Sequence, residues 1–218
     1  NRGETDSARI RSVIIEGTAN LYVACIENNV RKIIHTGSSS EYGLKQKPIS
    51  EDMLLEPNTE YGVAKAWATL YGEHLRRERG LDVTTLRLFS VYGPYESNQR
   101  FFPATIMALM SEKLPSLSNK QTARDFIYVD DVIQALILAQ TEDAGVFNVG
   151  TGVESTLGDA VQIIQKILHS KVQATWGGIE GRSFDSAHWV ADTRLAQSDL
   201  HFTASTSLED GIMNSISW

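Results

Sequence analysis

The sequence of 218 residues has a single cysteine and no long hydrophobic run. That cysteine, Cys25, cannot form a disulfide bond within the chain, so we expect a reducing, cytoplasmic setting. Because no stretch of about 18 apolar residues occurs, we expect no transmembrane helix. The first ten residues, NRGETDSARI, are polar and do not resemble the apolar centre of a signal peptide. We therefore expect no association with a membrane.

Basic residues are also in short supply. The chain has 20 Lys and Arg against 27 Asp and Glu, which gives a formal net charge of −7. A surface of this charge repels nucleic acids and anionic lipids, so neither is expected as the main partner. The histidines do not have the spacing of metal ligands, and we expect no metal site. They are His35, His74, His169, His188 and His201.

The composition that remains is that of an ordinary globular protein, with one large domain or slightly more expected. Hydrophobic periodicity predicts helices that alternate with strands. Helices are predicted at residues 9–29, 59–79, 102–113, 131–141, 155–169 and 208–216. Strands are predicted at residues 30–36, 81–91, 124–129 and 145–150. This alternation predicts an α/β fold with a mostly parallel sheet flanked by helices.

Four residues are predicted to begin or end these helices. Thr59 is a plausible N-cap for helix 59–79, and Gly80 a plausible stop. Asp130 is predicted to cap the helix at 131–141, and Ser155 to begin the helix that follows it.

Tyr61 and Lys65 lie four residues apart in the predicted helix 59–79, so their side chains share one face. A free tyrosine has a pKa near 10, and an ammonium one turn away favours the phenolate and lowers that value. Such a tyrosine could exchange a proton with an alcohol or a ketone. The alternative is that both side chains simply reach from an apolar helix into solvent.

A serine-rich loop follows the predicted strand at 30–36. The segment HTGSSSEYG offers the hydroxyl groups of Ser38, Ser39 and Ser40, at the carboxyl end of a strand where α/β sheets bind ligands. A second strand, within LRLFSVYGP, should end beside the first. The alternative is an ordinary serine-rich turn.

Seven segments occur in an order that carries a family resemblance. They are GTANLYVAC, IIHTGSSSEYG, EPNTEYGVAKAWA, LRLFSVYGP, ARDFIYVDDV, FNVGTG and GRSFD. Together they resemble the extended short-chain dehydrogenase/reductase family, which contains the NAD-dependent nucleotide-sugar epimerases and dehydratases. The resemblance runs from about residue 10 to the last residue. It implies a Rossmann-like sheet, truncated in its first half, and a small C-terminal α/β part that binds substrate.

The resemblance implies a catalytic role for Ser38, Tyr61 and Lys65. Ser38 occupies the position that hydrogen-bonds the reacting sugar oxygen, and Tyr61 that of the acid–base tyrosine. Lys65 matches the lysine that holds the nicotinamide ribose. The cofactor implied is NAD, with NADP possible. The residues implied to bind it are Gly37, Tyr61, Lys65, Leu88, Phe89 and Val91.

The resemblance also implies a nucleotide-diphosphate sugar as substrate, contacted by Ser39, Ser90, Arg124 and Arg182. A forked, permanently charged guanidinium suits a diphosphate, which is the role implied for the two arginines. The alternatives are a structural pair between Arg124 and Asp125, and a solvated loop charge at Arg182.

One part of the family pattern is missing. The family begins with a strand, a glycine-rich turn and a helix that receive the cofactor pyrophosphate. The segment VGTGVESTLG at 149–158 has glycines, but it lies too far downstream of Tyr61 and Lys65, and we interpret it as unrelated. We expect a longer natural chain. Residues 1–100 would belong to the cofactor-binding domain and 101–218 mainly to the substrate-binding part, with about 124–145 returning to the first.

We expect a nucleotide-sugar 4-epimerase similar to UDP-glucose 4-epimerase. The 4,6-dehydratases of the family have an Asp-Glu pair where this chain has Ser39 and Ser40, which disfavours water elimination. A nucleotide-4-keto-sugar reductase is the first alternative, and a non-catalytic remnant that binds a nucleotide sugar or a protein partner is the second. A homodimer through helices 9–29 and 59–79 is implied; alternatively, Trp67 packs on the chain's own loops.

Overall fold

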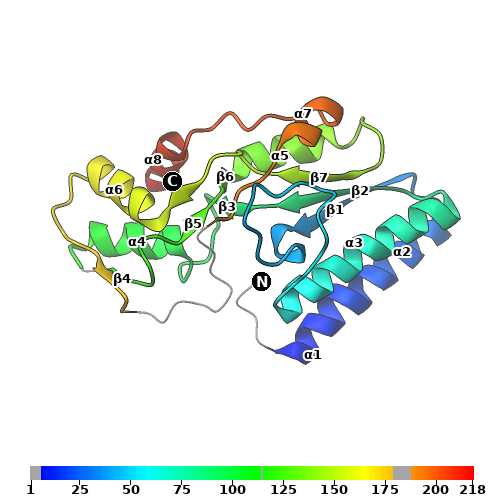
Figure 1. Cartoon of the computed structure of the whole chain (residues 1–218), viewed down its shortest axis with the longest axis horizontal. Helices are drawn as coiled ribbons and strands as arrows, with labels where there is room; N and C mark the ends of the chain where they lie inside the picture. Colours follow the sequence, from blue (N-terminus) through cyan, green and yellow to red (C-terminus); the bar gives the residue numbers. More distant parts are fainter. Residues whose placement is uncertain (1–5, 114, 179–187) are drawn as a thin grey trace.

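The computed structural model describes residues 6–113, 115–178 and 188–218. Its centre is a parallel three-stranded sheet in the order β1 (Lys32–Ser38), β2 (Asp82–Leu88) and β7 (Val146–Val149). Figure 1 shows the strands in the right-hand half of the molecule, with their carboxyl ends directed toward its middle. The predicted α/β fold with a parallel sheet is confirmed.

Helices cover both faces of this sheet (Figure 1). One face carries a continuous helical segment of α1 (Ser7–Ile10), a π-helical stretch (Arg11–Glu16) and α2 (Gly17–Glu27), beside the long helix α3 (Glu60–Arg79). The opposite face carries α5 (Val129–Leu138) and α7 (Arg194–Asp199). Helix α3 therefore lies directly against the strand that ends in the serine-rich segment.

The left-hand part of the molecule in Figure 1 holds three further helices and short paired strands. The helices are α4 (Phe101–Met110), α6 (Leu157–Ile167) and α8 (Leu208–Ser217). The parallel strand pairs are β3 (Ser90–Tyr92) with β6 (Phe126–Tyr128), and β4 (Ser116–Leu117) with β9 (Thr175–Trp176). Strand β5 (Ala123–Arg124) pairs antiparallel with β8 (Ser155–Thr156).

Strand register brings the carboxyl ends of the three central strands to one line. Ser38 pairs with Leu88, and Leu88 pairs with Val149. The expectation that strand 81–91 ends beside the serine-rich segment is therefore confirmed. Side chains that follow these strand ends meet at a single edge of the sheet, which is where ligands bind in open α/β sheets.

The sheet is buried on both faces, as its run of aliphatic residues requires. Val83 and Leu86 of β2 face opposite sides, because successive strand residues alternate. The cluster toward α2 and α3 consists of Tyr22, Ile33, Leu75, Leu81 and Val83. The cluster toward α5 and α7 consists of Leu86, Ile127, Val132, Ala135, Ala139, Phe147, Val149, Ala196, Leu200 and Phe202.

Two predicted strands are each divided by one residue. The segment predicted as strand 81–91 breaks at Phe89, whose N–H bonds Val149 (3.0 Å) while the next N–H, of Ser90, bonds Asp125 (2.9 Å). The chain thus leaves the central sheet and joins a new partner. Asp125 likewise separates β5 from β6 in the segment predicted as strand 124–129. A hydrophobic run alone does not reveal such a change of partner.

Two of the four predicted helix boundaries are confirmed. Thr59 caps α3 by accepting a hydrogen bond from the Gly62 N–H (3.0 Å), and α3 ends at Gly80 in the left-handed conformation. The other two predictions were wrong. Helix α5 begins after Tyr128, so Asp130 lies inside its first turn. Thr156 rather than Ser155 caps α6, because it forms a reciprocal capping box with Asp159.

Among the helices of residues 6–113, 115–178 and 188–218, none has the length and apolarity needed to cross a membrane. Within the same ranges, no cluster of three or more histidine, cysteine, aspartate or glutamate side chains is placed to hold a metal ion.

Candidate functional site

Ser38 is the last residue of β1 and is almost fully buried, with 8% of its surface exposed. The chain turns there into a short 3-10 helix, η2 (Ser39–Glu41). The Ser38 Oγ accepts a hydrogen bond from the N–H of Ser40 (3.2 Å). A hydroxyl that accepts a backbone N–H keeps its own proton for another partner. Ser38 is therefore held as a hydrogen-bond donor at the end of the strand.

The start of α3 rests directly on this serine turn. Tyr61 lies in the first turn of α3 and is half-buried, next to Gly62. A Cβ atom at Gly62 would lie 2.5 Å from the carbonyl oxygen of Ser40, so any residue with a side chain would clash with this oxygen. Glycine is thus required for the close approach that brings Tyr61 to the end of β1.

Lys65 links α3 to the same strand one helical turn later. Its Nζ donates a hydrogen bond to the carbonyl oxygen of Thr36, two residues before Ser38. Burial lowers the pKa of the Lys65 ammonium, and the Glu41 carboxylate acts in the opposite direction. Burial also lowers the pKa of the neighbouring His35 to about 4, with the Lys65 charge as the second cause. Ser38, Lys65 and the first turn of α3, which carries Tyr61, thus lie at the carboxyl end of β1.

These residues fit the nicotinamide end of a dinucleotide. An ammonium has three N–H donors, and the bond to Thr36 uses one, so Lys65 retains donors for ribose hydroxyls. The adjacent Gly37 has no room for a side chain, because buried side chains of the turn and of β2 lie against it. A Cβ atom there would lie 2.9 Å from the Glu41 Oε1 and 2.9 Å from the Thr85 Cγ2.

Beneath the serine turn lies a charged pair that the sequence reasoning missed. Glu41 is fully buried, and its Oε1 accepts the N–H of Ser38 (2.8 Å). Its Oε2 accepts a hydrogen bond from the Nε of Arg87 (2.8 Å), which lies in β2 and is 4% exposed. Burial raises the pKa of the Glu41 carboxyl, while the Arg87 guanidinium and the Ser38 N–H oppose that change.

The bonds continue from this pair across the sheet. Arg87 Nη1 donates to the Tyr42 hydroxyl (2.8 Å), and that hydroxyl donates to Asn148 Oδ1 (2.8 Å). Asn148 Nδ2 then donates to the carbonyl oxygen of Ile49 (2.7 Å). Glu41, Arg87 and Asn148 come from the carboxyl-end regions of β1, β2 and β7 respectively. One buried network therefore ties the three strand ends together.

A signal for this pair was present in the sequence. Arg87 stands between leucines in a strand that is otherwise suited to burial on both faces, and Glu41 stands in a buried serine turn. A charged residue in a buried strand needs an opposite charge nearby. The partner could not be chosen from the sequence, because it lies 46 residues away.

The C-terminal part of the chain reaches the serine turn through Trp189. This residue is 1% exposed, and its indole Nε1 donates to the Oγ of Ser39 (3.1 Å). The guanidinium carbon of Arg124 lies 5.8 Å from the centre of the Trp189 ring, and Arg124 Nη1 donates to the carbonyl oxygen of Ala123 (2.7 Å). Ser39 and Arg124, both predicted to contact substrate, are thus brought together around one indole ring.

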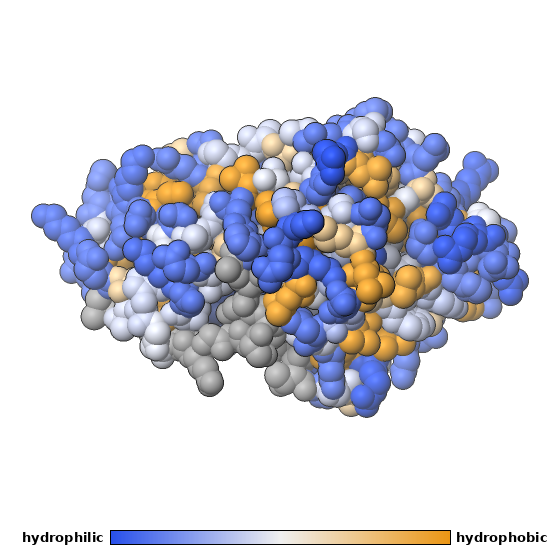
Figure 2. Space-filling model, in the orientation of Figure 1, coloured by the Kyte–Doolittle hydropathy of each residue, from blue (hydrophilic) through white to orange (hydrophobic). Residues whose placement is uncertain are grey.

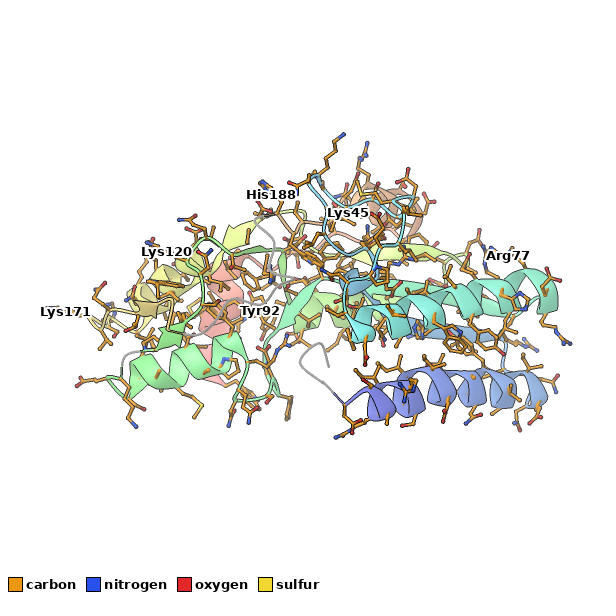
Figure 3. All side chains as sticks on the ribbon, turned by 60° about the horizontal axis from the view of Figure 1, so that its bottom comes forward. Lys45, Arg77, Tyr92, Lys120, Lys171 and His188 are labelled. Atoms are coloured by element: carbon orange, nitrogen blue, oxygen red, sulfur yellow. The ribbon has the colours of Figure 1, made fainter. Side chains whose placement is uncertain are left out.

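His188 directly precedes Trp189 and shares a partner with it. In Figure 3, His188 lies on the same side of the molecule as Lys45, and Arg77 lies at the far end of α3. His188 Nδ1 is 3.1 Å from Glu154 Oε2, and the other oxygen of Glu154 accepts the Trp189 N–H (2.9 Å). Arg182, also predicted to contact substrate, lies outside the described residues.

The remaining predicted residues follow β2. Leu88 and Val91 are partly buried and pack against the core beneath α5. Phe89 is 5% exposed and packs with Tyr42, Ile49, Trp189 and Ala191 in a separate cluster. Ser90 is half-buried at the start of β3. Phe89 is therefore almost fully buried in this cluster, whereas Leu88, Ser90 and Val91 are partly exposed to solvent.

Backbone N–H groups of the glycine segment at 149–158 bind a buried carboxylate of the chain itself. Asp125 is fully buried, and its carboxylate accepts the N–H groups of Thr151 (2.8 Å) and Gly152 (3.0 Å). It also accepts the Thr151 hydroxyl (2.7 Å) and the Ala191 N–H (3.1 Å). Because these N–H groups already donate to Asp125, they are not available to bind a phosphate. The negative charge of Asp125 would also repel a phosphate. The structure agrees with the interpretation that this segment does not bind pyrophosphate.

The chain is similar to known proteins over most of its length. Residues 2–150 match the model of the NAD dependent epimerase/dehydratase family. An uncharacterized UDP-glucose epimerase of Bacillus subtilis is 30% identical over 94% of this chain, and the chain spans 65% of that relative.

Two solved structures show the same fold. UDP-N-acetylglucosamine 4-epimerase from Methanobrevibacter ruminantium, in complex with UDP-N-acetylmuramic acid, has a TM-score of 0.92 and 28% identity. The match covers 98% of this chain and 70% of that structure. UDP-glucuronic acid 4-epimerase from Bacillus cereus, in complex with UDP-glucuronic acid and NAD, has a TM-score of 0.87 and 27% identity. That match covers 94% of this chain and 66% of the structure.

Proposed function

Because this chain belongs to the NAD dependent epimerase/dehydratase family, we propose that it acts as a nucleotide-sugar 4-epimerase. The observation that supports the proposal is the placement of Ser38, Lys65 and the first turn of α3, which carries Tyr61, at the carboxyl end of β1. Gly62 brings the start of α3 onto the serine turn, and Lys65 bonds the carbonyl oxygen of Thr36. Both contacts are features of the fold, independent of any ligand.

The proton chemistry follows from these positions. Tyr61, as the phenolate, would take the proton of the sugar C4 hydroxyl and later return it. The Lys65 cation would stabilise the phenolate. Ser38 would donate a hydrogen bond to the C4 oxygen, because its Oγ already accepts the Ser40 N–H. These three groups manage the proton and hold the oxygen in place.

NAD is the cofactor that this role requires, and it supplies the acceptor and donor of the C4 hydride. Tyr61 and Lys65 would hold its nicotinamide ribose. The other residues proposed to contact it are Gly37, Leu88, Phe89 and Val91. UDP-glucuronic acid 4-epimerase from Bacillus cereus, which shares the fold, was crystallised with NAD. NADP stays open, since NAD and NADP share the nicotinamide end.

The proposed substrate is a nucleotide-diphosphate sugar. Arg124 and Arg182 would hold the diphosphate, and Ser39 and Ser90 would contact the remainder of the substrate. Water elimination is not expected. Ser39 is engaged by Trp189, and Glu41, the nearest carboxylate in the turn, is fully buried against Arg87. It is therefore not available as an acid or base for a dehydratase reaction.

We also propose a homodimer through α1, α2 and α3. Large hydrophobic side chains are exposed on α2, on α3 and on the π-helical stretch that precedes α2, at Val13 (63%), Leu21 (57%), Val63 (51%) and Leu70 (56%). Figure 2 shows hydrophobic residues at the surface in the right-hand half of the view, around α3. Trp67 stacks on Tyr71 of its own helix, with ring centres 5.0 Å apart. Sedimentation at increasing concentration tests this proposal, and a monomer throughout would contradict it.

The enzymatic test uses purified full-length protein with NAD and a series of UDP- and dTDP-hexoses. We expect interconversion of C4 epimers, detected by chromatography, without net formation of NADH. Net consumption of NADH or NADPH with a 4-keto sugar would replace the proposal with a ketoreductase. Tight binding of a nucleotide sugar with no turnover of any hexose would favour a non-catalytic binding protein.

A further inference from the structure

The Glu41 carboxylate lies against the same piece of backbone that organises the proposed catalytic residues. Thr36, Gly37 and Ser38 are consecutive. Lys65 bonds the carbonyl oxygen of Thr36, and Glu41 Oε1 accepts the N–H of Ser38 (2.8 Å). Between them, the Cβ position of Gly37 is only 2.9 Å from Glu41 Oε1. The carboxylate and the ammonium therefore contact neighbouring peptide groups of one strand.

We infer that Glu41 is a positioning residue for the proposed reaction: its carboxylate, fixed by Arg87, holds Ser38 in place and supplies the negative charge that faces Lys65. This inference rests on the proposed function for the roles of Ser38 and Lys65. The geometry assigns two separable tasks to one side chain. One is the hydrogen bond to the Ser38 N–H, and the other is the charge.

The first task concerns the direction of the Ser38 hydroxyl. Ser38 is the N-cap of the η2 turn, where its Oγ accepts the Ser40 N–H and its own N–H donates to Glu41. Both bonds close a small reciprocal box that fixes the backbone and side chain of Ser38 together. Arg87 holds the carboxylate from the next strand, so the box cannot rotate freely. A donor held in this way needs no reorganisation when the C4 oxygen arrives.

The second task concerns the charge on Lys65. Burial favours the neutral amine, whereas the proposed role needs the cation. Two ionisable groups of other elements interact with the Lys65 charge: Glu41 from the turn and His35 from β1. The neutral form of His35 is favoured in this position, since burial and the Lys65 charge lower its pKa to about 4. Glu41 is thus the negative partner that opposes the effect of burial on Lys65.

Two substitutions separate the tasks. Glu41→Gln keeps an acceptor oxygen for the Ser38 N–H but removes the charge. Glu41→Asp keeps the charge but shortens the side chain, so the bond to Ser38 is lost. Glu60→Gln is the matched control, because Glu60 is an exposed acid in the first turn of α3, where water screens its charge.

The direct readout is the titration of Lys65, followed by NMR of the full-length protein with 13C-methylated lysines and assigned with Lys65→Arg. In Glu41→Gln we expect the Lys65 midpoint to move to lower pH by about one unit. Glu41→Asp and Glu60→Gln should keep it near the wild-type position. This measurement needs no substrate, so it stands or fails separately from the epimerase activity.

The kinetic readout uses the C4 epimerisation assay. Glu41→Asp should lower kcat by about tenfold or more with little change in KM, because Ser38 is displaced from the reacting oxygen. Glu41→Gln should instead move the alkaline limb of the pH profile to lower pH, since Lys65 loses its proton earlier. A side chain with only a structural role would lower Tm in both variants without moving the pH profile.

Glu41→Gln leaves the Arg87 charge buried without its partner, and this variant could fail to fold. The double variant Glu41→Gln with Arg87→Met removes both buried charges and is the second test. It should move the Lys65 midpoint in the same direction, by less than the single variant. A Lys65 midpoint that is the same in wild type, Glu41→Gln and the double variant would overturn the inference.

Discussion

Two fully buried carboxylates organise this molecule, and they are satisfied in different ways. Asp125 accepts four hydrogen bonds from neutral donors, namely the N–H groups of Thr151, Gly152 and Ala191 and the hydroxyl of Thr151. Glu41 accepts one backbone N–H, from Ser38, and is paired with the guanidinium of Arg87. Burial raises the pKa of both carboxyls, and each is opposed by its own donors.

The difference indicates what each group does. Asp125 ties β5 and β6 to the turn after β7 and to the segment at Ala191, so its four bonds hold separate parts of the chain together. Glu41 lies among groups that carry charge and, by our proposal, move a proton. Hydrogen bonds from neutral donors hold segments of the chain together, whereas a buried ion pair also sets the local electrostatic field.

The largest effect on stability is expected at Asp125. Asp125→Asn keeps one acceptor oxygen but replaces the other with an NH2 group. This NH2 group cannot accept the two hydrogen bonds that the lost oxygen accepted. With two donors left unpaired, we expect a loss of about 4 kcal/mol in the free energy of unfolding. For a chain of this size that corresponds to roughly 10 °C in Tm. Thermal unfolding measures it, with the exposed Asp130→Asn as control. An unchanged Tm would show that the hydrogen bonds of Asp125 do not stabilise the fold.

The next effect is expected at the Glu41–Arg87 pair. Arg87→Met leaves a buried carboxylate without its cation, which should cost about 3 kcal/mol. Glu41→Gln leaves the opposite charge and should cost about 2 kcal/mol. The double variant has no buried charge, and we expect it to be more stable than either single variant. Chemical denaturation of the four proteins measures this coupling. Additive losses would show that the pair is not energetically coupled.

A smaller, pH-dependent effect is expected at His35, the half-buried neighbour of Lys65. Its pKa is lowered to about 4, chiefly by burial, so protonation favours the unfolded chain. The stability that it contributes is complete above pH 6.5 and is lost as the pH falls from about 6.5 to 4. We expect a loss of about 2 kcal/mol across this range, after allowance for its partial exposure.

Comparison of wild type with His35→Phe isolates this effect, because Glu41 and Asp125 are common to both proteins. The difference between the two unfolding free energies should change with pH only between about 4 and 6.5. Parallel curves throughout that range would contradict the lowered pKa of His35.

The smallest effect is expected where the C-terminal part reaches the serine turn. Trp189→Phe keeps an aromatic ring in the cluster with Phe89 but loses the hydrogen bond to Ser39. We expect the lost hydrogen bond to account for about 1 kcal/mol of the decrease in stability, in addition to the cost of the smaller buried ring. Trp218→Phe is the matched control, because Trp218 is 69% exposed. Equal stabilities for the two variants would mean that the bond to Ser39 contributes nothing measurable.

Much of the fold could be predicted from local sequence patterns. The period of apolar residues located the helices, and Thr59 and Gly80 marked the ends of α3 because capping is a local interaction. The failures have two causes. Phe89 and Asp125 break their strands because the chain changes its partner there, and such changes depend on segments distant in sequence. Thr156 rather than Ser155 caps α6 because Asp159, three residues later, completes its capping box, which is a local signal that the prediction overlooked.

The site shows the same division. Ser38, Tyr61 and Lys65 could be proposed from spacing and family resemblance, and the structure places Ser38, Lys65 and the helical turn that carries Tyr61 at one strand end. The Glu41–Arg87 pair and the Trp189 bond to Ser39 could not, because their partners are 46 and 150 residues apart. Sequence spacing detects chemistry on one helix, but not the buried groups that support it from another strand.

The most direct test of the central claim is the turnover of Tyr61→Phe in the C4 epimerisation assay. Removing the phenol oxygen removes the proposed acid–base group and leaves the ring, so kcat should fall by about 10²–10⁴-fold while Tm is retained. Tyr71→Phe, a half-buried tyrosine on the same helix, should turn over like wild type. Wild-type turnover by Tyr61→Phe would contradict the assignment of this residue as the proton carrier.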